Sequence, residues 1–123
     1  MSNARNRESI EATLYAYLNG MRHADPGLLK IAFHDDANLC GPMGDSMLTG
    51  PVSRLLSWVE NDLAPGGTGR DHGMRVEEIE IHEPIALVKC RETGFLGRDA
   101  LDVFTLVQQG AGWKITNKSW TLM

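Results

Sequence analysis

The chain has 123 residues, of which 42% are hydrophobic, and this is enough to build one domain, residues 1–123, around a core of its own. The formal net charge is −4 and no basic stripe interrupts the acidic balance, so we do not expect a nucleic-acid partner. No apolar run is long enough to cross a bilayer and the first residues lack the apolar segment of a signal peptide, so we expect a cytoplasmic protein without membrane contact.

Helices are expected in the first half of the chain. Residues 1–7 are polar, and we expect them to be disordered. From Glu8, apolar residues recur at helical spacing, which predicts a helix to about His23 with Tyr17 turned toward the interior. Asp25 stands before a proline, which is typical of a helix start, so a short second helix should follow.

A third helix is expected after Thr49-Gly50-Pro51. Before it, residues 38–41 predict a short strand and residues 42–46 predict turns. After it, residues 64–69 are rich in glycine, and we expect a flexible loop within the domain.

The second half of the chain predicts strands only. Residues 75–82 and 84–93 are two of them, and residues 99–122 form a long hairpin. Three helices followed by antiparallel strands indicate an α+β fold, in which the helices pack on one face of a curved sheet. Such a sheet encloses a cone with a mouth, which predicts a pocket.

One carboxyl group stands out in the hairpin. Asp102 shares its strand face with Ala100, Phe104 and Leu106, because side chains alternate between the two faces of a strand. A charge on an apolar face is costly, so we expect the pKa of Asp102 to be raised by burial. Either a ligand or an internal hydrogen bond would explain its place.

Nearly the whole chain resembles the nuclear transport factor 2-like superfamily, and most closely its SnoaL-like proteins and the branch described as "putative lumazine-binding". The resemblance rests on the order and spacing of these segments: Tyr17-Leu-Asn-Gly, Ala32-Phe-His-Asp-Asp-Ala-Asn, Gly50-Pro51, Asp102-Val-Phe-Thr-Leu and Gly112-Trp-Lys-Ile-Thr-Asn-Lys. It implies a cone-shaped α+β barrel with a cystatin-like fold, often a homodimer, with one deep pocket. The superfamily includes both enzymes and non-enzymatic binding proteins, so the fold alone does not fix the chemistry.

One enzyme of this superfamily, ketosteroid isomerase, has an aspartate base and an oxyanion hole formed by a tyrosine and a protonated aspartic acid. The resemblance places the tyrosine at Tyr17 and the oxyanion-hole aspartate at Asp102. It places the base at Gly41, which cannot abstract a proton. The resemblance therefore implies a retained oxyanion pair without its base, and steroid isomerase activity is not expected.

A cluster of ionisable residues lies at His34, Asp35 and Asp36. Three consecutive side chains cannot all point one way, so we expect a solvated polar segment and no metal site. His34 is kept as a candidate acid–base residue, because the ordinary pKa of histidine lies near neutrality.

The aromatic residues are candidate walls of the pocket, although each of them could instead fill the core. Trp120 shares a strand face with Lys118, and the sequence does not tell whether that face points inward. A solvated Lys118 is the expectation. The candidate walls are Phe33, Trp58, Phe104 and Trp120.

The favoured hypothesis is a small-molecule-binding protein in which Tyr17 and Asp102 hold the polar end of a hydrophobic, partly aromatic ligand. The alternative is an isomerase, cyclase or dehydratase that acts on a polyketide- or steroid-like substrate through Asp102, Tyr17 and His34. A third hypothesis is an interaction module with a solid core. No cofactor is expected, and the resemblance implies a homodimer through the convex face of the sheet.

Overall fold

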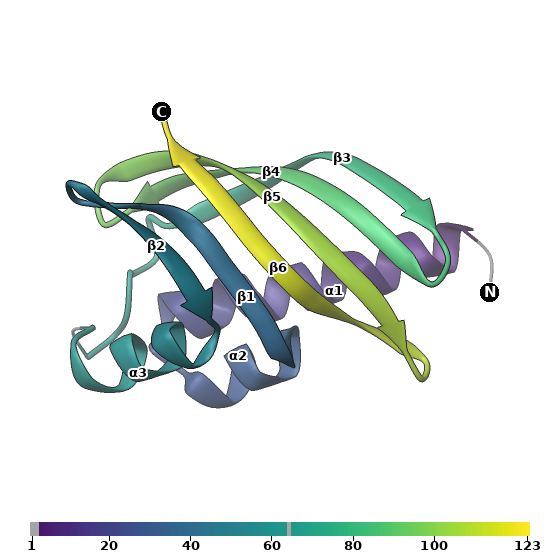
Figure 1. Cartoon of the computed structure of the whole chain (residues 1–123), viewed down its shortest axis with the longest axis horizontal. Helices are drawn as coiled ribbons and strands as arrows, with labels where there is room; N and C mark the ends of the chain where they lie inside the picture. Colours follow the sequence, from purple (N-terminus) through teal and green to yellow (C-terminus); the bar gives the residue numbers. More distant parts are fainter. Residues whose placement is uncertain (1–2, 64) are drawn as a thin grey trace.

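The protein is seen here in a computed structural model that describes residues 3–63 and 65–123. Six strands form one curved, unclosed sheet in the order β2-β1-β6-β5-β4-β3, and the three helices lie on its concave side (Figure 1). The elements are α1 (Asn3–Arg22), α2 (Pro26–Ala32), β1 (Phe33–Met43), β2 (Ser46–Pro51), α3 (Ser53–Asn61), β3 (Gly73–His82), β4 (Ile85–Phe95), β5 (Arg98–Gln109) and β6 (Gly112–Leu122). The predicted α+β class is confirmed.

The sheet differs from the expectation in two respects. Strand β1 pairs with β6 in parallel, whereas every other neighbouring pair of the sheet is antiparallel. Strand β2 occupies residues for which turns and a helix start were expected. This strand lies at the edge of the sheet and alternates only between exposed and half-buried residues, so its sequence lacks the clear apolar alternation of a covered strand.

Helix α1 begins at Asn3, so the expectation of disorder is wrong for residues 3–7, while residues 1 and 2 lie outside the described part. The reason is the fully buried side chain of Asn6. Its Nδ2 donates to the carboxylate of Glu83, and its Oδ1 accepts from Trp113 Nε1 at 3.3 Å and from Gln108 Nε2 at 3.5 Å. This network ties the start of α1 to the β3–β4 turn and to the β5–β6 hairpin.

The loop between α3 and β3 approaches the end of α1. The backbone N–H of Thr68 donates to the carbonyl of Met21 at 3.0 Å, and Gly67 lies so close to the same carbonyl that a Cβ there would be 2.3 Å from it. The loop expected to be flexible is therefore hydrogen-bonded to the helix at Thr68, and Ala64 lies outside the described residues.

A β-bulge decides which side chains of β6 face the interior. Leu106 pairs with Ile115, but Thr105 already pairs with Asn117, so Thr116 is an extra residue on β6. Residues on both sides of the bulge therefore face the concave side: Trp113, Ile115, Lys118 and Trp120.

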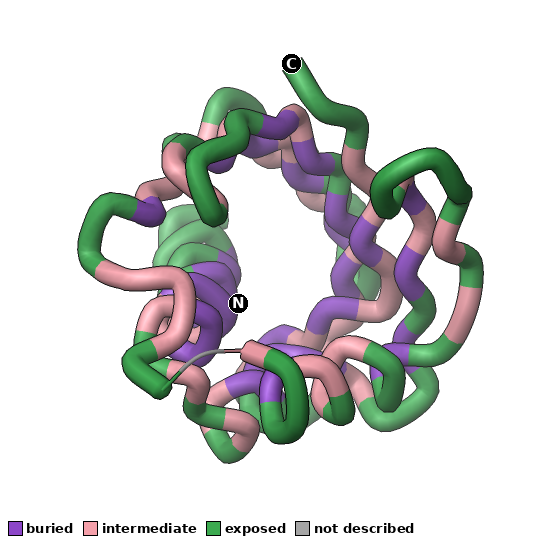
Figure 2. The backbone as a smooth tube through the Cα atoms, turned by 90° about the vertical axis from the view of Figure 1, so that its left-hand side faces the viewer, coloured by how far each residue is buried: buried purple, intermediate pink, exposed green. Residues whose placement is uncertain are grey.

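The expectation of a solvated Lys118 is wrong, because only 8% of this residue is exposed. Viewed from the end where α3 lies, the buried residues line the inner side of both α1 and the strands (Figure 2). None of the described helices is long and apolar enough to cross a membrane.

Replacing Asn6 by Ala should lower the free energy of unfolding by about 1–3 kcal/mol, because the indole N–H of Trp113 loses its acceptor in a buried place. Urea denaturation at neutral pH measures this loss. The matched control is Asn3→Ala on an exposed position of the same helix, which should change the stability by less than about 0.5 kcal/mol. Equal effects of the two substitutions would contradict the structural role of the Asn6 network.

Candidate functional site

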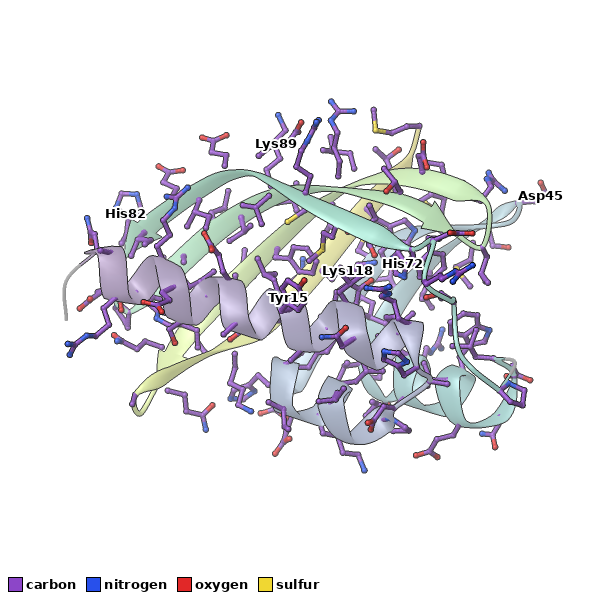
Figure 3. The ribbon with its side chains drawn as sticks, turned by 180° about the vertical axis from the view of Figure 1, so that it is seen from behind. Tyr15, Asp45, His72, His82, Lys89 and Lys118 are labelled. Carbon is purple, nitrogen blue, oxygen red and sulfur yellow. The ribbon has the colours of Figure 1, made fainter. Side chains whose placement is uncertain are left out.

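Five polar side chains from different elements meet inside the curved sheet. They come from α1, from the segment before β3, from β4, from β5 and from β6: Tyr17, His72, Glu92, Asp102 and Lys118. All five are buried, and Figure 3 shows Lys118 and His72 in the same region of the interior, beside α1. We call this group the inner cluster.

Glu92 is the hub of the inner cluster. Tyr17 Oη donates to its two carboxylate oxygens at 3.0 and 3.1 Å, His72 Nε2 lies 2.6 Å from Oε1, and Lys118 Nζ lies 3.3 Å from Oε2. A carboxylate only accepts hydrogen bonds, so His72 presents a protonated Nε2 to it. The other ring nitrogen, Nδ1, lies 2.7 Å from Thr68 Oγ1. Buried and fully partnered, Glu92 fixes the orientation of three other side chains.

Glu92 and His72 were not among the residues predicted from the sequence. The pattern of residues in β4 nevertheless indicates that Glu92 is buried. Alternation along β4 places Ala86, Val88, Cys90 and Glu92 on one face, and all four are buried. The argument that singled out Asp102 on β5 therefore applies equally to Glu92 on β4. His72 lies in a loop, where no periodicity tells the direction of a side chain.

Charges in the inner cluster are strongly coupled. Burial alone would raise the pKa of Glu92, but the Lys118 ammonium, together with hydrogen bonds from Asp102 and His72, holds that pKa below its ordinary range. Burial by itself would lower the pKa of Lys118, but the carboxyl groups of Glu92 and Asp102 outweigh it and raise that pKa. Glu92 is therefore a carboxylate and Lys118 an ammonium at neutral pH.

Asp102 behaves in the opposite way from Glu92. Burial raises its pKa to about 9, and the neighbouring Glu92 adds to this rise while Lys118 opposes it. As a carboxylate it has no donor for either oxygen within the described residues, because Lys118 Nζ remains 3.9 Å from Oδ1. As a neutral acid it loses the repulsion from Glu92 and can donate to that carboxylate. The two carboxyl groups therefore hold one proton between them at neutral pH.

The predicted pair of Tyr17 and Asp102 is found in this cluster, but in an arrangement different from the one expected. Tyr17 already donates to Glu92, and burial followed by the charges of Glu92 and Asp102 raises its pKa well above the ordinary value. The rings of Phe33 and Phe104 pack edge-on against Tyr17 at 5.9 and 5.7 Å, and both are buried in the core. These two candidate walls therefore pack against the ring of Tyr17 within the core.

Gly41, where the resemblance to ketosteroid isomerase implies the base position, is covered by Trp120. A Cβ on Gly41 would lie 2.2 Å from Cδ2 of the indole, so no side chain fits there while the indole stays in place. Trp120 Nε1 donates to the carbonyl of Pro42 at 3.0 Å, and Lys118 Nζ lies 4.7 Å from the ring centre. The sequence did not tell whether the strand face of Trp120 and Lys118 points inward. In the structure both side chains face inward.

Trp58 lies on the rim of the same interior. Its ring stacks on Phe95 with centroids 6.3 Å apart and an interplanar angle of 18°, and Phe95 in turn packs edge-on against His72 at 5.0 Å. Trp58, Phe95 and Trp120 are all half-buried. All three pack against the buried core, and Phe95 connects Trp58 to His72 of the inner cluster; we call these three residues the aromatic rim.

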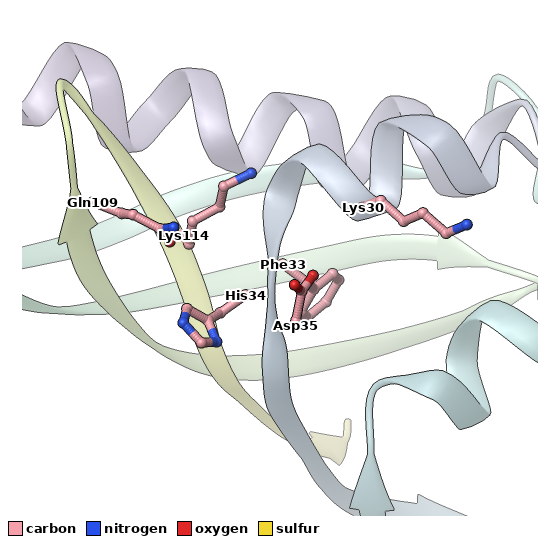
Figure 4. Close-up of a pocket in the computed structure, with 6 residues that line it drawn as sticks. All are labelled: Lys30, Phe33, His34, Asp35, Gln109 and Lys114. Carbon is pink, nitrogen blue, oxygen red and sulfur yellow. The ribbon is translucent and has the colours of Figure 1, made fainter.

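The structure places His34 elsewhere. Phe33, next to it, pairs with Ile115 on β6, whereas Asp102 pairs with Trp120 near the other end of that strand. His34 lines a surface cavity of about 180 Å³ beside the β5–β6 turn, together with Lys30, Phe33, Asp35, Gln109 and Lys114 (Figure 4). The expectation that His34 acts with Tyr17 and Asp102 therefore has no geometric basis here.

A second cavity, of about 470 Å³, lies over the strands β3 to β6, and its lining does not include Tyr17 or Asp102. Residues 3–63 and 65–123 contain no group of three His, Cys, Asp or Glu side chains that could hold a metal ion.

Comparison with known proteins agrees with this architecture. The family model described as "putative lumazine-binding" matches residues 5–121. An NTF2-like protein of unknown function from Silicibacter pomeroyi DSS-3 has a TM-score of 0.89 at 18% identity, with 100% of each chain covered. An NTF2-like protein of unknown function from Methylobacillus flagellatus KT has a TM-score of 0.86 at 25% identity, covering 100% of this chain and 95% of that one.

A more distant neighbour is described as a putative dehydratase from the NTF2-like family of Streptomyces avermitilis. It has a TM-score of 0.73 at 14% identity, with 99% of each chain covered. At this identity the likeness concerns the fold alone. No curated protein matches the chain.

Stability should fall as the pH rises from about 5.5 to about 8.5, because the folded protein keeps a proton on Asp102 that the unfolded chain, with a pKa of about 3.9, releases. One retained proton corresponds to a slope of about −1.4 kcal/mol per pH unit at most. The lowered pKa of Glu92 acts with the opposite sign, but only in the acid range below its unfolded pKa.

Urea denaturation across this pH window measures the slope. Asp102→Asn should flatten it, since an amide does not titrate, and the control Asp45→Asn in the exposed β1–β2 turn should keep it. An Asp102→Asn variant with the slope of the unsubstituted protein would place the retained proton elsewhere.

Proposed function

The chain belongs to the "putative lumazine-binding" family of the nuclear transport factor 2-like superfamily, and from this premise we propose that it binds a small, hydrophobic, partly aromatic molecule on the concave side of its sheet. The polar end of the ligand would meet the inner cluster. Its apolar part would lie at the aromatic rim, against Trp58 and Phe95.

The observation that carries the proposal is Asp102. It is fully buried, and neither carboxylate oxygen receives a hydrogen bond from a described residue. Buried polar atoms are almost always partnered, so such an atom indicates a partner that is not part of the chain. Sharing a proton with Glu92 satisfies one oxygen of Asp102 at most. The other oxygen is left to accept from an N–H or O–H of a ligand.

Lys118 supports the same proposal. Its ammonium is nearly buried, and of its three N–H groups the described contacts engage Glu92, with Asp102 somewhat farther away. The remaining donor capacity faces aromatic rings, because Nζ lies 5.3 Å from the ring centre of Tyr17 and 4.7 Å from that of Trp120. A carbonyl or other acceptor of a ligand would be a stronger partner for this group than a ring face.

Catalysis of the isomerase, cyclase or dehydratase kind is the second candidate function. A neutral Asp102 beside the Lys118 ammonium favours it, since both could stabilise negative charge that develops on a substrate oxygen. Two features count against it. Gly41 offers no base, and Glu92 is held ionised by three donors, which makes it a weak proton acceptor. Binding is therefore the function that we favour.

Homodimerisation through the convex face of the sheet is also part of the proposal. Three apolar side chains on the outer sides of β4 and β5 are exposed, Ile85 by 58%, Leu87 by 45% and Val103 by 37%. Ile85 and Leu87 also line the hollow of about 470 Å³ over β3 to β6. We propose that a second copy of the chain covers this face, because a two-fold symmetric contact buries the same apolar patch on both copies.

The binding proposal predicts that protein purified from its own source carries a non-covalent small molecule through Asp102. Native mass spectrometry should show an added mass that disappears on denaturation. In Asp102→Leu, which has no acceptor, the occupied fraction should fall at least about fivefold, because a buried donor of the ligand left without its partner costs about 1–3 kcal/mol. Asp45→Leu, purified in the same way, should keep the ligand. An unoccupied wild-type protein, or full occupancy of a folded Asp102→Leu variant, would refute the proposal.

The dimer proposal predicts that Leu87→Lys shifts the protein to a monomer, because an ammonium would be buried against the apolar face of the partner. Sedimentation velocity at micromolar concentration measures the change. Ile31→Lys is the matched control, since Ile31 is 59% exposed on α2, which lies on the concave side of the sheet (Figure 1). A wild-type protein that sediments as a monomer, or a dimer unaffected by Leu87→Lys, would show that this face is not the interface.

A further inference from the structure

The side chain of Trp120 occupies a defined slot beside the inner cluster. Its floor is the backbone of Gly41, where a Cβ would lie 2.2 Å from Cδ2 and 2.3 Å from Cε2 of the indole. One edge of the slot is the carbonyl of Pro42, which accepts the indole N–H at 3.0 Å. The Lys118 ammonium lies over the ring face at 4.7 Å from its centre. The slot therefore fits a flat ring with one N–H group at its edge.

This slot lies directly beside the unpartnered carboxyl. Trp120 pairs with Asp102 across β5 and β6, and both side chains face the concave side of the sheet. Asp102 is fully buried and Lys118 is 8% exposed, whereas Trp120 is only half-buried. Asp102 does not line either of the two cavities described above. Trp120 on β6 is therefore a half-buried neighbour of the buried Asp102 on β5.

Trp120 is also held less firmly than the other inward tryptophan of β6. Only 3% of Trp113 is exposed, and its indole N–H donates to Asn6 in the network at the start of α1. Trp120 is only half-buried, and within the described residues its indole has one hydrogen bond, to Pro42, and one cation–π contact, with Lys118. Moving Trp120 away therefore exposes less buried surface than moving Trp113 would.

We propose that Trp120 fills the ligand site from within, as a stand-in for the ligand, and that the natural ligand is a planar aromatic compound with a ring N–H that displaces the indole. This proposal rests on the proposed binding function and adds the chemical class of the ligand. In the slot the ring of the ligand lies on Gly41 and under Lys118, its N–H donates to Pro42, and its other polar groups reach Asp102.

This arrangement explains why residue 41 is a glycine. Only a residue without a side chain lets an aromatic ring lie flat on the strand at this position. The absence of a side chain at position 41, which leaves no base there, also creates the floor of an aromatic slot.

The first test empties the slot and refills it with indole. Trp120→Ala removes the ring, and isothermal titration calorimetry should show that this variant binds free indole at least tenfold more tightly than the wild type does. N-methylindole, which has no N–H for Pro42, should bind the variant several-fold more weakly than indole. Trp58→Ala is the matched control, because it deletes a half-buried tryptophan outside the slot and should not create an indole site.

The second test fills the floor of the slot and does not depend on the Trp120→Ala variant folding. Gly41→Ala should push the indole out, so the side-chain N–H of Trp120 should shift in a ¹⁵N–¹H spectrum and exchange with solvent at least tenfold faster. Gly112→Ala is the control, since a Cβ there meets no atom within 4 Å. An unchanged Trp120 signal in Gly41→Ala would overturn the proposed slot.

Failure of this inference can be told apart from failure of the binding function. If the wild-type protein carries a small molecule by native mass spectrometry but Trp120→Ala, shown by circular dichroism to be folded, binds indole no better than Trp58→Ala does, binding stands and the displacement proposal is overturned. If Trp120→Ala binds indole and the ligand released from the wild type is a planar aromatic compound with a ring N–H, the proposal is supported.

Discussion

One proton shared by two buried carboxyl groups determines the properties of the interior. Asp102 and Glu92 are both inside the curved sheet with a single ammonium, that of Lys118, and the interior cannot hold two carboxylates against one cation without a large loss of stability. The proton goes to Asp102 because Tyr17, His72 and Lys118 all serve Glu92. Glu92 thereby becomes a fixed structural acceptor, and Asp102 becomes a neutral acid with unused hydrogen-bonding capacity.

The bulge at Thr116 makes this balance of charges attainable. Without the extra residue, a β6 strand that buries Trp113 and Ile115 would turn Lys118 and Trp120 to the convex face. Glu92 and Asp102 would then lack a buried cation, and Gly41 would lack the ring that covers it. A single additional residue in one strand therefore supplies both the counter-ion of the inner cluster and the indole of the slot.

The alternation of side chains along single strands predicted much of the fold correctly. The predictions failed where this alternation is interrupted. The curved sheet with helices on one face, the inward Tyr17 and the buried acid at Asp102 all follow from periodicity and are found in the structure. Lys118 was misplaced because the bulge changes the phase of β6, which no local residue pattern announces. Residues 3–7 were misplaced because Asn6 looks solvated by composition and is buried through partners 77 to 107 positions away.

The sequence by itself determined the α+β architecture, the family of the chain and the single most unusual group, an acid on an apolar strand face. Those features depend on local periodicity and on the order of segments, and both can be read from the amino-acid sequence. Only the tertiary structure decided that Tyr17 serves Glu92, that His34 lies near the other end of the sheet, and that Trp120 covers Gly41. These are contacts between residues far apart in the chain, and their geometry is set by strand register and by competition among buried charges, neither of which exists before the chain folds.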